Sequence, residues 1–439
     1  AINSGFAADL YVNNSGQSGT YSTINGALAA ASSGDRIFVS PMNFYAEDLT
    51  ITKSILISPT NSGSKISLDG SVYIQPIPGM EVSIIGLEAD KINLSSVAST
   101  ASLANTAKLN IVSSTFSADC GLRASGLLTY IHDSHFKQRL LVTHCEITKS
   151  IVGTWLAINK GTSGSISSAD TVRIIACHIN LLEYSTEKYH LFALNNYFNA
   201  CYIYEIPSNA LPGKSIFANN YVHNSVSYLI DPTQIKNWTH LDIYNCQIGV
   251  DIRAMYKYIL YNKSTGVSSN QYSSTDFYNE SYYNASTYTR TYPYYWTNSG
   301  NVSGTKTPNV LYCQVSLPFS YFYPKENLTG IDAQVDLVGA LHYNYPKNQI
   351  SVSGSPKDST WISQFYGLNQ DLGSPASNFA DLDLTRNDIG ILGGSHSWLN
   401  YWYNETSTTG NAVIRWIDLP SEIWPGQTVN LKAEAVHTN

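Results

Sequence analysis

A short segment that recurs along residues 109–248 restricts the fold more than any other feature of the sequence. In each copy, an alternating apolar run is followed by a small residue, a polar residue and a large apolar residue. Several successive copies lie about 20–26 residues apart, a spacing typical of solenoid repeats. The interval from Phe136 to Ile147 is too short for a full turn, so one of the two matches that end there is expected to be spurious. The small residues of the copies form one column, which consists of Ser114, Ser134, Cys145, Cys177, Asn196, Asn220 and Cys246.

The period of the apolar residues within each copy predicts the secondary structure. Apolar and polar residues alternate, so each copy is expected to be a β-strand with one buried face. No helical stretch of the kind that βαβ units require separates the copies. A coil of short strands, stacked about 4.8 Å apart, satisfies both observations. The fold class is therefore predicted to be all-β, a parallel β-helix.

The column of small residues is expected to lie at a bend between two strands, where each side chain points inward and stacks on the next turn. Asn can adopt left-handed backbone angles there and can stack its amide into a ladder. The cysteines of the column are expected to be packed thiols rather than catalytic groups. Disulfides between adjacent turns remain the alternative, because stacked Cα atoms would be about 5 Å apart.

The first sixty residues carry a family resemblance. Residues 10–59, which run from LYVNNSGQSGT to ILISP, resemble the opening turn of right-handed β-helix proteins of the pectin-lyase-like superfamily. The resemblance implies a right-handed coil capped by a short helix at residues 23–31. It also implies a Gly34-Asp35 turn that leads into a first strand at residues 36–40. A cap of this kind protects the unpaired backbone at the end of the coil.

A second resemblance lies near the C-terminus. Gly373-Ser-Pro-Ala376, followed by the run from Asp381 to Gly394, is similar to the closing motif of secreted β-helix proteins of the Bacteroidota type. Leu384 replaces the usual Gly, and Ile391-Leu392 replaces an Ala-aromatic pair. Such proteins are often exported by the type IX system and include adhesins and polysaccharide-active enzymes. The resemblance implies a secreted or cell-surface location and an outer-membrane or secretion-system protein as a partner.

Composition narrows the classes of protein to which the chain can belong. Charged residues make up 13% of the 439 residues, and the formal net charge is −7; globular proteins average about a quarter charged residues. Hydrophobic residues make up 43%, which excludes intrinsic disorder. No run approaches about 18 apolar residues, so no membrane span is expected. A mildly acidic chain without a basic stripe is also not expected to bind nucleic acid. With no signal peptide visible, the composition favours a mature, exported chain.

Three parts of the chain are expected. Residues 1–40 form the N-terminal cap and first turn, and residues 41–395 form the β-helix with a Tyr-rich excursion at 256–300. Residues 396–439 form a C-terminal β-extension, either a strand pair or the start of a small β-sandwich that leads into a further domain.

Catalytic residues are not assigned from the sequence. The Gly-His-Gly and Arg-x-Lys elements of polygalacturonase-type enzymes are not present as a set. His132, His135, His144 and His178 fall near one another in the repeat and could share a face, although such positions more often carry solvated histidines. Two carboxylates set for glycoside hydrolysis cannot be found by spacing alone, because distant turns would supply them.

The best metal candidate is the group of oxygen ligands at Asp381, Asp383, Asn387 and Asp388. Alternate carboxylates suit calcium, which is the one cofactor that the sequence suggests. The alternative is that these residues hold the closing turn through backbone hydrogen bonds. A zinc site is not expected, because the six cysteines include no CxxC pair.

The Tyr-rich stretch from residue 256 to 296 breaks the repeat. Exposed Tyr and Trp rings are suited to stacking on sugar rings or on partner proteins. The alternative is that the stretch packs its aromatic residues along the side of the coil. The expected ligand-binding residues are Tyr282, Tyr283, Tyr292, Tyr294, Tyr295 and Trp296.

Together, these features favour an exported cell-surface adhesin or glycan-binding protein without catalytic activity. Its expected partner is a polysaccharide or a surface glycan. One alternative is a polysaccharide lyase or glycoside hydrolase on the same fold. Another is a structural spacer, or secretion-system cargo, that carries a further domain.

Overall fold

The structure is a computed structural model of the 439-residue chain. It describes residues 8–15, 17–41, 44–95, 107–124, 126–159, 171–185, 189–205, 215–223, 226–230, 241–244, 246–248, 252–262, 268–273, 288–291, 309–311, 314–315, 387–388, 390–394, 396–402, 412–418 and 432–437.

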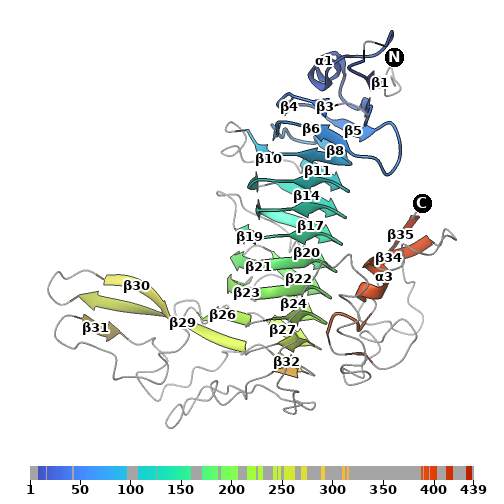
Figure 1. The fold of residues 1–439 in the computed structure, drawn as a ribbon. Helices are drawn as coiled ribbons and strands as arrows, with labels where there is room; N and C mark the ends of the chain where they lie inside the picture. Colours follow the sequence, from blue (N-terminus) through green and yellow to red (C-terminus); the bar gives the residue numbers. More distant parts are fainter. Residues whose placement is uncertain are drawn as a thin grey trace, which may run out of the picture.

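The chain winds into a parallel β-helix with three strand positions in each turn (Figure 1). The first position builds a twelve-stranded sheet in which every neighbouring pair is parallel. Its strands are β1 (Asp9–Val12), β2 (Arg36–Val39), β5 (Ile55–Pro59), β8 (Glu81–Ile85), β11 (Ala107–Val112), β14 (Leu127–His132), β17 (His144–Thr148), β20 (Thr171–Ile175), β22 (His190–Leu194), β24 (Ser215–Ala218), β27 (Leu241–Tyr244) and β32 (Asn309–Leu311).

The second and third positions build the other large sheet. The second strands are β3 (Phe44–Tyr45), β6 (Ile66–Leu68), β9 (Leu87–Ala89), β12 (Thr115–Phe116), β15 (His135–Phe136), β18 (Ile151–Val152), β25 (Tyr221–Val222), β28 (Gln247–Ile248) and β33 (Gln314–Val315). The third strands are β4 (Leu49–Ile51), β7 (Ser71–Ile74), β10 (Lys91–Leu94), β13 (Cys120–Leu122), β16 (Arg139–Val142), β19 (Trp155–Asn159), β26 (Val226–Ile230) and the start of β29 (Ile252–Asn262). In two turns the second and third strands fuse, as β21 (His178–Ser185) and β23 (Tyr197–Glu205). The predicted fold class, an all-β parallel β-helix, is therefore confirmed. The predicted right hand is the one that nearly all parallel crossover connections adopt.

From β11 onward, a two-residue corner joins the first strand to the second strand in successive turns. The first corner residue has a left-handed backbone, with φ between 45° and 53°, at Ser113, Asp133, Lys149, Ala176, Asn195 and Asn219, and Gly86, the single residue between β8 and β9, has φ of 63°. The prediction placed left-handed angles in the inward column itself. The structure places the left-handed backbone angles one residue earlier in the chain. The side-chain amides of Asn196 and Asn220 are therefore free of that role and hydrogen-bond to each other between adjacent turns.

The second corner residue points inward and forms a hydrogen-bonded ladder along the coil. The backbone N–H of Ser114 donates to Ser134 Oγ (3.2 Å), and that of Ser134 donates to Ser150 Oγ (3.1 Å). Further along, the N–H of Cys177 donates to Asn196 Oδ1 (2.9 Å). These corner residues are buried, so the ladder supplies partners that water cannot.

One member of the predicted column is wrong. Cys145 lies within β17, where it pairs with Thr129, and Ser150 occupies the corner of that turn. The cause is a short turn, because the single residue Thr143 separates β16 from β17. The match that ended at Ile147 was the spurious one. Among the described residues, Cys120, Cys145, Cys177, Cys201 and Cys246 are buried and form no disulfide.

The N-terminal end of the coil is capped as the resemblance implied. Helix α1 (Ile24–Ala30) begins after Thr23, whose Oγ1 accepts from the Gly26 N–H (3.0 Å). The Glu47 carboxylate accepts from the Ile24 N–H (2.7 Å), and Lys53 Nζ donates to the Leu28 and Ala31 carbonyls at the other end. These charges match the helix dipole. Gly34, with φ of 97°, makes the predicted turn into β2.

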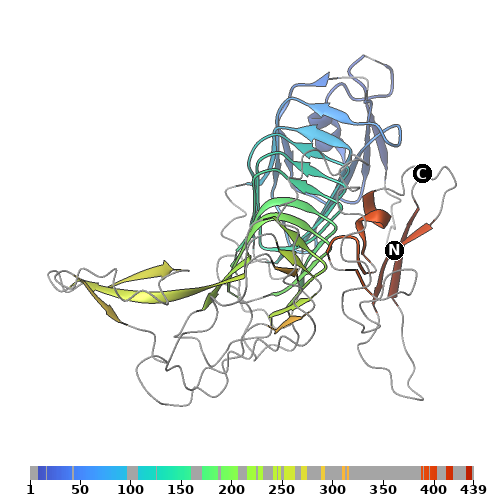
Figure 2. The ribbon, with the colours of Figure 1, turned by 60° about the horizontal axis from the view of Figure 1, so that its bottom comes forward.

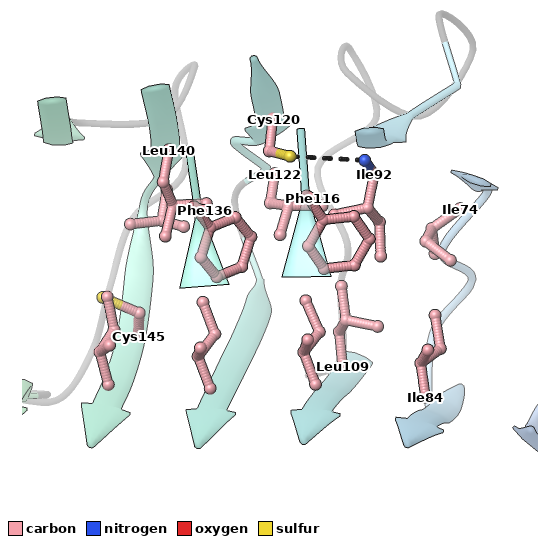
Figure 3. Packing of buried hydrophobic residues seen from close by; sticks show 14 of the residues in the cluster. Ile74, Ile84, Ile92, Leu109, Phe116, Cys120, Leu122, Phe136, Leu140 and Cys145 are labelled. Atoms are coloured by element: carbon pink, nitrogen blue, oxygen red, sulfur yellow. Dashed lines mark hydrogen bonds between the residues drawn. The ribbon is translucent and has the colours of Figure 1, made fainter. Parts of the chain in front are cut away.

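The core consists of aliphatic and aromatic side chains that stack turn on turn (Figure 3). Phe116 stacks on Phe136 with ring centroids 5.2 Å apart, and both are fully buried. Cys120 takes part in the core, where its Sγ accepts from the Ile92 N–H (3.5 Å). Stacking of like residues at one position gives each turn the same cross-section and keeps the strands in register.

Two strand groups lie outside the regular coil (Figure 2). β29 pairs in parallel with β26 at residues 252–256, then continues as the partner of the antiparallel strands β30 (Ser268–Ser273) and β31 (Tyr288–Thr291). At the C-terminal end, β34 (Ala412–Asp418) and β35 (Lys432–His437) form an antiparallel pair, as predicted. Among the described residues, no helix has the length and apolar character needed to cross a membrane.

Candidate binding face

None of the six ligand-binding residues predicted from the sequence lies among the described residues. Tyr282, Tyr283, Tyr292, Tyr294, Tyr295 and Trp296 lie outside the described residues, as do Asp381 and Asp383. Asp388 is described, and its backbone carbonyl accepts from Asn219 Nδ2 (2.9 Å). That contact agrees with the alternative in which this motif holds a turn. The described residues contain no group of three or more His, Cys, Asp and Glu that could hold a metal, so calcium stays a prediction.

The four histidines do not share one face, contrary to the expectation. His132 and His144 lie on first strands, whereas His135 and His178 lie on the second strands beyond the corner. His132 Nδ1 lies 2.8 Å from Thr148 Oγ1, and the His144 ring stacks on Tyr189 at 4.5 Å. Burial lowers the pKa of His178 to about 4, so this histidine is neutral near pH 7. The corner separates His132 and His144 from His135 and His178, because the chain passes at the corner from the first sheet into the second.

The closing motif packs against the side of the coil. We refer to residues 387–402, which include helix α3 (Trp398–Trp402), as the C-terminal clasp. The side-chain amides of Asn195 and Asn219 donate to the clasp: Asn195 to the Ile391 carbonyl (3.2 Å) and Asn219 to Asn387 Oδ1 (2.7 Å). In return, Trp398 Nε1 donates to the Asn195 carbonyl and Trp402 Nε1 to the Ala176 carbonyl. The clasp therefore recognises the left-handed corner residues of three successive turns.

The clasp explains a break in the alternation of the first strands. One outward column of the first sheet runs through Val112, His132, Thr148, Ile175, Leu194 and Ala218. Its last three members are buried in one cluster with Ile391, Trp398 and Trp402. In the sequence, Ile174-Ile175, Ala193-Leu194 and Phe217-Ala218 each place two apolar residues in succession. That repeated break was the signal that another segment covers these turns.

The outer face of the third strands differs from the other two faces in its connections. Residues 95–106, 160–170, 206–214 and 231–240 all connect a third strand to the next first strand, whereas each corner from β11 onward contains two residues. In solenoids, insertions that gather on one face often mark the binding face. We refer to the outward residues of β16, β19 and β21, together with Thr143 directly after β16, as the third-strand face; the strand residues are Arg139, Leu141, Trp155, Ala157, Asn159, Leu181, Glu183 and Ser185.

This face combines an aromatic ring with an ordered charge pair. The Arg139 guanidinium lies over the Trp155 ring, 5.5 Å from its centroid, and also pairs with Asp119 (2.7 Å). Asp119 accepts in addition from the Arg139 backbone N–H (3.1 Å). Both contacts hold the pKa of Asp119 below its usual range. Asp119 therefore stays ionised and structural, and it is a poor candidate for a catalytic acid.

Several polar atoms of the same face lack hydrogen bonds. Thr143 Oγ1, Trp155 Nε1 and Asn159 Oδ1 are closed to solvent and have no partner in the structure, and Ser95 Oγ is in the same state after β10. Thr143 is only 2% exposed, and Ala157 between Trp155 and Asn159 is fully buried. Because Val142 pairs with Ile158, Thr143 and Asn159 lie side by side on adjacent turns. A buried polar atom without a partner costs about 1–3 kcal/mol, so this cluster is a place where ligand hydroxyls would be stabilised.

The sequence signal for this face was weak, because its residues come from three turns and share no motif.

No known protein family, no curated protein and no solved structure shows significant similarity to this chain.

Proposed function

We propose that this protein is an exported cell-surface protein that binds glycans on its third-strand face and does not cleave them. The observation that carries the proposal is the cluster of buried polar atoms without partners at Thr143, Trp155 and Asn159. A polyhydroxylated ligand supplies both donors and acceptors, as this mixed set of atoms requires. When sugar hydroxyls displace the side chains that close over these atoms, the missing hydrogen bonds are formed.

The aromatic and charge content of the face also supports a glycan. The Trp155 ring is held in place by Arg139, and such fixed aromatic rings provide the flat apolar surface on which sugar rings stack. The low overall charge of 13% suits a neutral or weakly charged ligand. The Tyr-rich segment at 256–300 would extend the binding surface, and β29 leaves the coil at its start.

The cell-surface part of the proposal depends on the sequence. The closing motif from Asp381 to Gly394 resembles that of secreted β-helix proteins of the Bacteroidota type, within the broader pectin-lyase-like superfamily. Export by a type IX system, with an outer-membrane or secretion-system partner, follows from that resemblance. Immunofluorescence on intact cells of the producing organism would test it, because an exported protein is labelled without permeabilisation.

The experiment that tests glycan binding is a glycan array run together with a polysaccharide depolymerisation assay, with and without calcium. We expect binding without new reducing ends or unsaturated products. The Thr143→Val variant should bind at least about tenfold more weakly, because it removes the hydroxyl and keeps the shape. Its control is Thr115→Val, the same change on a second strand. Product release would show that the protein is a lyase or hydrolase instead. Neither binding nor product release would favour the alternative in which the β-helix is a structural spacer.

A further inference from the structure

Glu183 is the carboxylate at the C-terminal end of the third-strand face. It lies in β21, where Ala157 precedes it by one turn and Tyr202 follows it by one turn in the register of the sheet. Its side chain is partly buried, and alternation with the buried residues Leu182 and Tyr184 directs it outward. It is therefore on the same side of the coil as Trp155 and Asn159.

Glu183 differs from Asp48 and Asp119, the acids that directly precede β4 and β13, in having no structural partner among the described residues. Asp48 accepts from the Ser71 N–H (2.7 Å), and Asp119 is bound by Arg139. Among the described residues, Glu183 has no hydrogen-bond or ion-pair partner, and the charge that acts on it is that of Arg123. Burial raises its pKa, and the positive charge of Arg123 opposes that rise. A partly desolvated carboxylate without a partner is under-satisfied and gains most from hydroxyl donors.

The neighbours of Glu183 limit what can approach it. Ala157, on the turn before Glu183, has the shortest side chain on the face and is fully buried. Tyr202 on the following turn provides a ring beside the carboxylate, and Asn159 provides an acceptor on the diagonal. A ring to stack on, beside a carboxylate that accepts from two donors, matches the chemistry of a pyranose with adjacent hydroxyls.

From this arrangement, and resting on the proposed function, we infer that Glu183 accepts hydrogen bonds from two adjacent hydroxyls of a neutral sugar, with Tyr202 beside the ring. The same carboxylate repels uronate sugars, because like charges repel each other strongly at a partly desolvated site. Glu183 is thus a specificity residue that selects neutral glycans over acidic ones.

The ionised form of Glu183 is the form that accepts from both hydroxyls. Because its pKa is raised, protonation begins at a higher pH than for an ordinary glutamate. The groups that face it are Ala157, Trp155 and Asn159 from β19, Tyr202 from β23 and the charged Arg123 after β13. Among the described residues around it, Arg123 is the one that carries a charge opposite to that of Glu183, so the loss of binding in acid is assigned to protonation of Glu183.

The test measures the affinities of neutral gluco- and manno-oligosaccharides and of oligogalacturonates for wild type and for Glu183→Gln. The amide keeps the shape and removes the charge. We expect the variant to bind neutral oligosaccharides about tenfold more weakly and to lose the acid limb of the pH profile. It should also bind oligogalacturonates more tightly than wild type does. Glu88→Gln, on the exposed part of β9, is the matched control.

The outcomes separate the two proposals. If wild type binds neutral oligosaccharides and Glu183→Gln binds them equally well, the role of Glu183 is overturned and glycan binding stands. If wild type prefers oligogalacturonates, the selection for neutral sugars is overturned. If wild type binds neither ligand, the proposed function fails first. Equal melting temperatures of wild type and variant would show that a loss of affinity is not a loss of folding.

Discussion

The indole Nε1 of Trp402 donates a hydrogen bond to the backbone carbonyl of Ala176, 226 residues earlier in the chain, at 2.8 Å. Trp398, one helical turn before it, donates in the same way to the carbonyl of Asn195. Residues four apart on a helix lie about 6 Å apart along its axis, and successive turns of the coil lie about 4.8 Å apart. The two spacings are close enough for α3 to reach one corner with each indole.

Removing the Trp402 hydrogen bond should loosen the clasp. In Trp402→Phe the buried Ala176 carbonyl loses its donor, which costs about 1–3 kcal/mol beyond the lost packing. We expect a lower melting temperature and faster limited proteolysis on the C-terminal side of α3. The control is Trp155→Phe, whose Nε1 has no partner in the structure. Equal destabilisation by the two substitutions would contradict the assigned role of the hydrogen bond.

The corner ladder should be sensitive to the loss of a single hydroxyl. Ser134→Ala removes the acceptor of the Ser114 N–H, which is buried and has no access to water. The free energy of unfolding should fall by about 1–3 kcal/mol. Thr129→Val in the preceding strand removes a buried hydroxyl that has no partner, and it should be neutral or slightly stabilising. Urea denaturation followed by circular dichroism measures both, and a larger loss in Thr129→Val would refute the ladder's contribution.

The stability of the coil should fall in mild acid because of His178. Burial, with a smaller contribution from His135, lowers its folded-state pKa from 6.5 to about 4. The unfolded chain therefore takes up a proton below pH 6.5, while the folded chain does so only near pH 4. The stabilisation is fully present above pH 6.5 and is lost as the pH falls towards 4, by at most about 3 kcal/mol.

His178→Phe tests that assignment, because it keeps a ring against Tyr197, which His178 meets edge-on at 4.6 Å. Between pH 7 and pH 4 the variant should lose less free energy of unfolding than wild type. Some acid sensitivity should persist, since burial and the nearby Arg173 lower the pKa of His396 in the clasp to about 4 as well. If the pH dependence of the free energy of unfolding is the same in His178→Phe as in wild type, His178 is not a source of the acid sensitivity.

The buried thiols should be inert in the folded protein. Burial raises the pKa of Cys120 and of Cys177 to about 12, and that of Cys145 in the same direction. Thiolate is the reactive form, so alkylation at pH 8 should spare these cysteines until denaturant is added. Site-specific mass spectrometry after iodoacetamide treatment measures this. Labelling of Cys177 at the rate of an exposed thiol would contradict the packing of the corner.

The regular part of the fold was predictable because its signal is local. Alternation within each copy and the spacing between copies sufficed for the strands, and Thr23 and Gly34 marked the cap. Cys145 was misplaced because Thr143 alone connects β16 to β17, which shortens one turn and lets an unrelated strand imitate the repeat. Position within a repeat can be assigned only where the turn length is constant.

The clasp and the binding face were beyond sequence reasoning for a different reason. Asn219 contacts Asn387, 168 residues away, and the sequence of neither segment indicates that the two are in contact. On the third-strand face, Thr143, Trp155 and Glu183 come from three turns, and their meeting depends on register rather than on a motif. What marks Thr143 and Trp155 is a missing hydrogen bond, which is a property of three-dimensional packing.

The two-residue corner has a consequence for protein engineering. Its fixed length means that foreign loops inserted there would break both the left-handed residue and the ladder. The connections after the third strands already include the single residue Thr143 and the longer span of residues 95–106, and the strands on either side of both keep their parallel pairing. Peptides grafted at those connections would be displayed in a row along one side of a rigid rod, with about 4.8 Å between neighbouring turns.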